Sequence, residues 1–195
     1  LTGTTTTLSL GTGSVFNGNV TATAPVLEVS GATFNGTAIL EQTGTIRGLG
    51  RGGNTFNQNV TFTTSGSGEM WLAYYAPDVI NENVFVNSPA GGGGIFFGQG
   101  YFVTTLAAGK TITVGSGGFV SGVLTLRRFV QLGATPQSLT LTGTAILSFG
   151  TGSIFNGAVT GTAPRLGIDG ATFNGTATLE QTGASNYSNN GGSTF

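Results

Sequence analysis

Short runs in which apolar and small polar residues alternate are spread along the whole chain. Examples are residues 19–23, 59–63, 110–114 and 137–142. Alternation with a period of two is typical of β-strands, whose successive side chains point to opposite sides. Glycine-rich turns bound each run, and no stretch has a convincing helical period. The pattern therefore predicts an all-β chain of short strands.

A long tandem repeat overlies this alternation. Residues 8–56 align without a gap onto residues 147–195 at an offset of 139, and 32 of the 49 aligned positions are identical. The chain thus holds one 139-residue unit and about two-fifths of a second, with residues 57–146 completing the first. A repeat of this kind is the sequence signature of a stacked, quasi-one-dimensional architecture.

A shorter repeat lies inside the long one and is marked by the pair Phe-Asn. A degenerate member is expected at Ile80-Asn81. The spacings of 18 and 22 residues occur in both copies, and the next spacing is 24. The positions expected to form a structural ladder are Phe16, Asn17, Phe34, Asn35, Phe56, Asn57, Phe155, Asn156, Phe173 and Asn174, with Phe195 following at the same phase.

A unit of about 18–24 residues has the length of one coil of a parallel β-helix, or β-solenoid. Equivalent Phe side chains of successive coils would then stack inside, about 4.8 Å apart. Each Asn would either join a hydrogen-bonded row or adopt the left-handed conformation of a tight corner. A β-sandwich has no reason to reuse Phe-Asn-Gly at a fixed phase. We therefore expect one continuous solenoid over residues 1–195, with six or seven coils per long unit, although Phe-Asn-Gly disappears in residues 88–136 and leaves the phase there undetermined.

Composition narrows the range of possible functions. Charged residues make up only 7% of the chain, with six Lys+Arg against seven Asp+Glu, so neither nucleic acid nor an anionic membrane is an expected partner. The chain has no His and no Cys, which excludes Ser-His and Cys-His catalysis and typical zinc ligation. No segment is apolar for long enough to insert into a bilayer. We expect neither a cofactor nor a metal.

The signature Gly-x-x-Phe-Asn-Gly-x-Val-Thr, at residues 13–21 and 152–160 and more loosely at 53–61, resembles the repeat arrays of very large secreted surface proteins of gliding and filamentous bacteria. That resemblance implies an extracellular or cell-surface location and a structural or adhesive role, as part of a fibre or hook-like appendage. The chain begins and stops within repeat-like sequence, which is typical of a segment of a longer protein. We expect a stiff rod without enzymatic activity.

Lateral packing against identical chains is expected from segments such as Ile95-Phe96-Phe97 and Tyr101-Phe102-Val103, which we predict to be exposed. The run Gly91–Gly94 is predicted to form an outward bulge. Arg127-Arg128 is interpreted as solvated charge, or as a salt-bridge partner for a neighbouring chain.

One patch has a distinct composition and is the candidate binding site. It contains Trp71, Tyr74 and Tyr75 together with Glu69 and Asp78. Aromatic faces stack on sugar rings while carboxylates accept hydroxyl hydrogen bonds, so a carbohydrate-binding or carbohydrate-cleaving module is the alternative function. The competing interpretation is that these rings cover the coil stack or contact a neighbouring chain.

Three other functions are weaker alternatives. The carboxylates of Glu41 and Glu180 occupy the same repeat position, which favours a structural role over catalysis. The glycine-rich turns carry Asn and Ser where calcium-binding repeats require Asp. Thr-x-Thr pairs at residues 21–23, 61–63 and 111–113 could form an ice-binding face, although unequal coil lengths would break a regular array.

Overall fold

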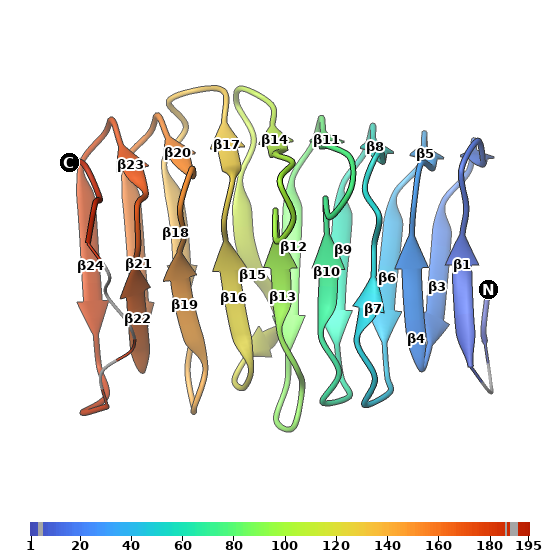
Figure 1. Ribbon diagram of the computed structural model, residues 1–195, viewed down its shortest axis with the longest axis horizontal. Helices are drawn as coiled ribbons and strands as arrows, with labels where there is room; N and C mark the ends of the chain where they lie inside the picture. The colour runs from blue at the N-terminus through green and yellow to red at the C-terminus, as the bar shows by residue number, and fades with distance from the viewer. Residues whose placement is uncertain (4–5, 186, 188–190) are drawn as a thin grey trace.

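A computed structural model describes residues 1–3, 6–185, 187 and 191–195. The described residues form 24 strands and no helix, and the strands stack in parallel as a β-solenoid of about eight turns. Each turn contributes one strand to each of three faces (Figure 1). The predicted all-β parallel β-helix is therefore confirmed.

The strands of the three faces follow one another in every coil. The first face consists of β1 (Thr7–Leu10), β4 (Val26–Val29), β7 (Gly48–Leu49), β10 (Met70–Leu72), β13 (Ile95–Phe97), β16 (Val123–Leu126), β19 (Ile146–Phe149) and β22 (Arg165–Ile168). The second face consists of β2 (Val15–Phe16), β5 (Thr33–Phe34), β8 (Thr55–Phe56), β11 (Asp78–Ile80), β14 (Thr104–Leu106), β17 (Phe129–Gln131), β20 (Ile154–Phe155) and β23 (Thr172–Phe173). The third face consists of β3 (Val20–Ala24), β6 (Ala38–Gln42), β9 (Val60–Thr64), β12 (Val84–Ser88), β15 (Ile112–Phe119), β18 (Gln137–Thr140), β21 (Val159–Ala163) and β24 (Ala177–Gln181).

Phenylalanine fills the interior along the second face. The rings of Phe16 and Phe34 stack with centroids 5.0 Å apart, and those of Phe34 and Phe56 stack at 4.9 Å. In the second copy Phe155 and Phe173 stack at 5.5 Å. These separations are close to the spacing of neighbouring strands, because each coil contributes one ring to the same row.

The strand register resolves the region in which Phe-Asn-Gly is absent. The Phe row continues through Ile80, Leu106 and Gln131 before returning to Phe155, because these residues occupy the equivalent positions of successive strands. The 139-residue unit therefore makes six turns, from β1 to β19. Coil lengths run from Phe16–Phe34, which are 18 residues apart, to Ile80–Leu106, which are 26 apart, so the upper bound exceeds the predicted 24.

Asparagine forms a second row just outside the Phe row. The side-chain amide of each Asn donates to the Oδ1 of the Asn one coil earlier, at 2.7–2.8 Å, through Asn17, Asn35, Asn57 and Asn81 and again from Asn174 to Asn156. The left-handed alternative is not used, because the non-glycine residues with positive φ in the described chain are Ala73 and Arg128. The glycine after Asn is needed for close approach of coils: a Cβ on Gly175 would lie 2.6 Å from the carbonyl carbon of Gly157.

Two expectations about exposed segments are wrong. Ile95 and Phe97 are fully buried and only Phe96 of β13 points outward, which weakens the basis for lateral packing through this segment. Gly92, Gly93 and Gly94 are also buried, and the Gly93 carbonyl accepts hydrogen bonds from the hydroxyls of Thr64 and Ser88 at 3.0 and 2.8 Å. This glycine run is therefore a packed corner, because its backbone approaches the preceding coil too closely for larger side chains.

Candidate functional site

A row of outward-facing residues on the first face forms the base of the candidate site. Strand β10 alternates so that Met70 and Leu72 are buried while Trp71 points outward. Trp71 is in register with Leu49 of β7 on one side and Phe96 of β13 on the other, and its ring centroid is 6.0 Å from that of Phe96. Parallel, in-register stacking of short strands thus brings apolar side chains from three coils together on the surface.

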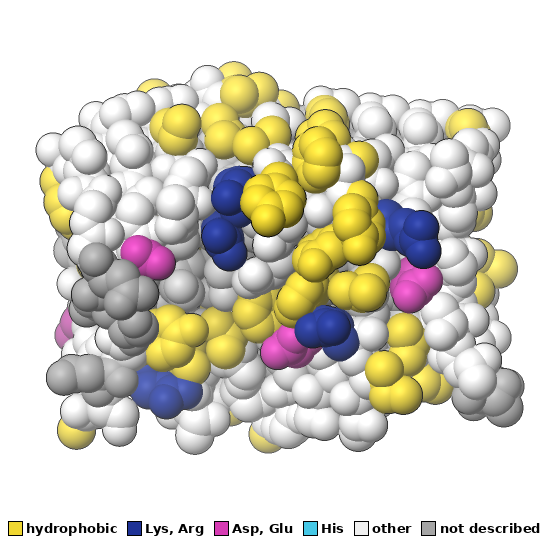
Figure 2. All heavy atoms as spheres, viewed as in Figure 1, with side chains coloured by type: hydrophobic (Ala, Val, Ile, Leu, Met, Phe, Trp, Pro, Cys, Tyr) yellow, Lys and Arg dark blue, Asp and Glu magenta, His cyan; other side chains and the backbone are white. Residues whose placement is uncertain are grey.

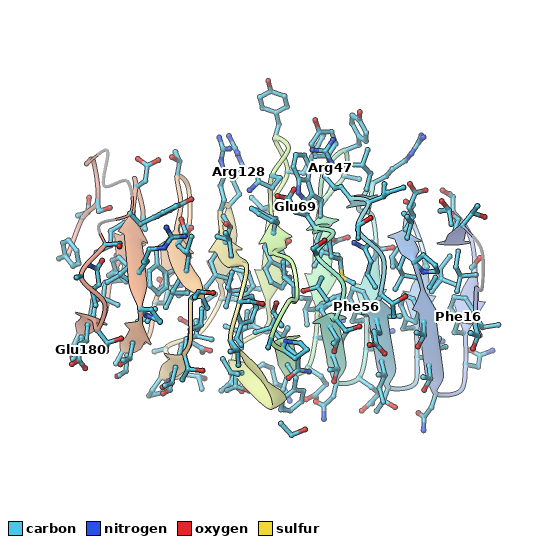
Figure 3. All side chains as sticks on the ribbon, turned by 90° about the horizontal axis from the view of Figure 1, so that it is seen from below. Phe16, Arg47, Phe56, Glu69, Arg128 and Glu180 are labelled. Atoms are coloured by element: carbon cyan, nitrogen blue, oxygen red, sulfur yellow. The ribbon has the colours of Figure 1, made fainter. Side chains whose placement is uncertain are left out.

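The Trp71 ring is fixed by two charged neighbours. Its indole Nε1 donates a hydrogen bond to Oε2 of Glu69 at 2.9 Å, and the guanidinium carbon of Arg47 lies 4.1 Å from its ring centroid. A guanidinium at this distance from an indole face makes a favourable cation–π contact. Figure 3 shows Arg47, Glu69 and Arg128 on the same side of the solenoid, away from Phe16 and Phe56.

Two tyrosines extend the aromatic surface at the corner after β10. The Tyr74 ring centroid lies 5.4 Å from that of Trp71, and the Tyr75 ring meets Tyr74 edge-on at 4.6 Å. Ala73, directly before them, has a φ of 52°. This left-handed conformation is uncommon for a residue with a Cβ, and it turns the chain so that both tyrosines emerge on the surface.

A hollow of about 270 Å³ adjoins the tyrosines and lies between the corners of two neighbouring coils. Its lining combines aromatic rings, backbone and one guanidinium: Tyr74, Tyr75, Gln99, Gly100, Tyr101, Phe102 and Arg127. Tyr101 is 88% exposed and projects from the rim. The corners fit closely, since a Cβ on Gly100 would overlap the backbone carbonyl of Tyr74.

Arg128 supports the far side of the hollow. Its Nη1 donates to the Gly100 carbonyl at 2.8 Å, and its guanidinium carbon lies 5.8 Å from the Tyr101 ring centroid. Arg128 also has a positive φ, of 47°. The Nε of Arg127 beside it is buried and has no hydrogen-bond partner in the part of the chain that the structure describes.

We refer to this surface as the aromatic–arginine patch. Figure 2 shows it as a hydrophobic band across the middle of the face, bordered by dark-blue basic side chains. It comprises Arg47, Trp71, Tyr74, Tyr75, Phe96, Tyr101, Phe102, Arg127 and Arg128.

The structure separates one predicted binding residue from the others. Trp71, Tyr74, Tyr75 and Glu69 lie together, but the Asp78 side chain is 1% exposed and faces the interior. Asp78 Oδ1 accepts hydrogen bonds from the backbone and side-chain amides of Asn54, both at 2.9 Å. Burial raises the pKa of the Asp78 carboxyl to about 6, although the Asn54 hydrogen bonds lower it in part. Asp78 is therefore a core residue, because the alternation of β11 directs it inward.

Sequence reasoning missed half of the patch. Arg47, Phe96, Tyr101 and Phe102 were not assigned to the site, and Arg127-Arg128 was interpreted as solvated charge. These residues are separated from Trp71 by whole coils, so nothing local to Trp71 identifies them. Counting positions modulo one coil would have placed Phe96 beside Trp71, because their strands pair in register.

The described residues contain no group of three or more His, Cys, Asp or Glu side chains that could hold a metal ion. They also contain no helix long and apolar enough to cross a membrane. The Thr-x-Thr pairs do not form a regular array on the third face, because Ile39 and Glu41 of β6 lie between the pairs of β3 and β9, and Phe85 and Asn87 follow in β12.

No protein-family model, curated protein or solved structure matches this chain.

Proposed function

We propose that this chain is a structural segment of a large extracellular bacterial fibre or cell-surface protein, in which it acts as a stiff rod that is lengthened by tandem repetition. The observation that carries the proposal is the way in which the two copies join. Strand β19, where the second copy begins, pairs with β16 of the first copy and with β22 of its own in one uninterrupted sheet. Repetition therefore extends the same solenoid and does not start a separate domain.

The directions of the contacts suit a load-bearing role. Backbone hydrogen bonds between coils run along the axis on all three faces, and the Phe and Asn rows run parallel to them. Bending such a rod would separate strands on one face and compress those on another, so it would disturb many hydrogen bonds at once.

The extracellular location rests on the resemblance to bacterial surface repeats and on the scarcity of basic residues. Six Lys+Arg in 195 residues leave few cleavage sites for trypsin-like proteases. Long-lived structures outside cells benefit from that property.

The experiment is to insert one additional copy of residues 8–146 into the chain and to measure the axial length by small-angle X-ray scattering and electron microscopy. Six further coils should lengthen the rod by about 29 Å, at about 4.8 Å per coil. The maximum dimension should increase while the cross-sectional radius of gyration stays constant.

A matched control carries a glycine-serine insertion of equal length at the same place. That control should produce a flexible loop with no discrete axial increment. A duplicated chain whose cross-section thickens, or whose length does not change, would show that the copies fold as separate units and would contradict the rod proposal.

A further inference from the structure

We propose that the aromatic–arginine patch binds an anionic polysaccharide, whose sugar rings stack on the exposed aromatic side chains while its carboxylate or sulfate groups are held by the arginines. This inference goes beyond the rod proposal and does not depend on it. The ligand chemistry follows from three independent features of the surface: the aromatic platform, the unpaired arginines and the strained rim of the hollow.

The aromatic platform has the character of a sugar-binding surface. Trp71, Tyr74 and Phe96 are in mutual ring contact, Tyr75 is 60% exposed and Tyr101 is 88% exposed. Stacking on the C–H face of a pyranose requires exposed rings of fixed orientation, and the Glu69 hydrogen bond to the indole and the edge-on Tyr74–Tyr75 contact supply that rigidity. The hollow of about 270 Å³ is slightly smaller than typical drug-sized sites of roughly 300–1,000 Å³, so it suits one ring of a longer chain.

The arginines select for negative charge. Within the described residues the ion pair that forms is Lys110–Glu82, at 2.6 Å, and none of the five arginines has a carboxylate within salt-bridge distance. Arg47 and Arg128 lie against aromatic rings, a geometry that holds the guanidinium in place without using all of its N–H donors. Arg47, Arg127 and Arg128 can therefore offer forked hydrogen bonds to a carboxylate or sulfate.

Backbone strain is concentrated at the same place. The two non-glycine residues with positive φ among those described are Ala73, directly before Tyr74, and Arg128, directly after Arg127. Both border the hollow. Strained conformations persist where they serve to position functional groups, and here they bring the tyrosines and the arginines to the rim.

A second copy of this chain is a less suitable occupant. A symmetric contact would place the same patch on both partners, so the arginines of one copy would face those of the other. The burial of Ile95 and Phe97 also reduces the apolar area available to such a contact.

The test uses the fluorescence of Trp71, which is the only tryptophan in the chain and therefore reports directly on the patch. The 195-residue protein is titrated with alginate, which carries carboxylates, with dextran sulfate, and with neutral dextran. We expect saturable changes in Trp71 emission with at least one of the two anionic polymers and none with dextran. The polymer that binds identifies the anionic group.

Two variants should weaken binding without altering the fold. Arg47→Gln removes an exposed guanidinium, and Tyr101→Ala removes a ring that is largely in solvent. Each should raise the dissociation constant about tenfold or more, the loss expected for a charged hydrogen bond or a stacking ring. Lys110→Gln is the matched control, because it removes the same charge on another face, beside Glu82.

Several results would overturn the proposal. One is the absence of any emission change with either anionic polymer, and another is equal binding of neutral dextran. Equal weakening by Lys110→Gln and Arg47→Gln would show that binding is nonspecific electrostatic attraction. Finally, dimers in sedimentation velocity that dissociate in Tyr101→Ala, together with no polymer binding, would assign the patch to self-association.

Discussion

At the residue scale, the most unusual group is the buried carboxyl of Asp78. Its Oδ1 is satisfied by Asn54, but Oδ2 is buried without a hydrogen-bond partner among the described residues, as is Oγ1 of Thr104 in the next coil. Asp78 and Thr104 are paired in register across β11 and β14. A carboxylate in this interior row is costly, so the folded state favours the protonated form.

This environment makes stability depend on pH. Because the pKa of Asp78 in the folded state is raised from 3.8 to about 6, the folded chain binds the proton more tightly than the unfolded chain. Stability should therefore fall as pH rises between these two values, by roughly 3 kcal/mol in total. Asp78→Asn should remove this loss, so that it stabilises the protein at pH 8 and has little effect near pH 4, as measured by urea unfolding.

The control for this measurement is Asp169→Asn, which changes the same functional group at a partly exposed position. It should leave the pH dependence of unfolding unchanged. If Asp78→Asn retains the pH dependence of the unsubstituted chain, the assignment of that dependence to Asp78 is wrong.

At the scale of elements, the Asn row shows how a weak contact is multiplied by stacking. Asn35 takes part in two side-chain hydrogen bonds of the row, one to Asn17 and one from Asn57, whereas Asn17 takes part in one. Asn35→Ala should therefore destabilise the chain by roughly 1–2 kcal/mol, and Asn17→Ala by about half as much. Chemical denaturation of both variants measures the difference.

The double variant tests whether the row acts as a unit. Since Asn17 and Asn35 share one hydrogen bond, the two losses should sum to more than the loss in the double variant. Strict additivity would mean that the row contributes through local corner geometry and not through bonds between coils.

The same elements show what the sequence could and could not predict. Phe16, Phe34 and Phe56 recur at one phase of a short repeat, so their stacking follows from periodicity alone, and the structure shows it. The phase of the middle coils could not be predicted, because Leu106 and Gln131 replace Phe and the coil lengths change. The patch was found only in part, because it is assembled from four coils whose register depends on that missing phase. Asp78 was misplaced for a related reason, since its inward direction follows from the β11 register.

At the scale of the whole molecule, the coil is the unit that can be added or removed. Phe34 and Phe56 are equivalent positions on neighbouring strands, so deletion of residues 35–56 joins two coils in phase. We expect this variant to fold with a β-rich circular dichroism spectrum and only moderately reduced stability, because each coil contacts mainly its neighbours.

Deletion of residues 35–45 is the matched comparison, since it removes half a coil. It should prevent cooperative folding of the flanking coils, because it shifts buried positions onto the wrong face. Equal stability of the two deletion variants would contradict a solenoid with one coil per Phe-to-Phe interval.

The whole number of turns in the 139-residue unit has a consequence for recognition. Because the unit makes six turns, each additional copy in this register would present its first face on the same side of the rod, about 29 Å further along the axis. A ligand that is itself a long polymer could then bridge successive patches, and each contact would raise the effective concentration at the next. Individual contacts of low affinity would combine into high avidity, and the residence time on such a polymer would be set by the number of copies in the chain.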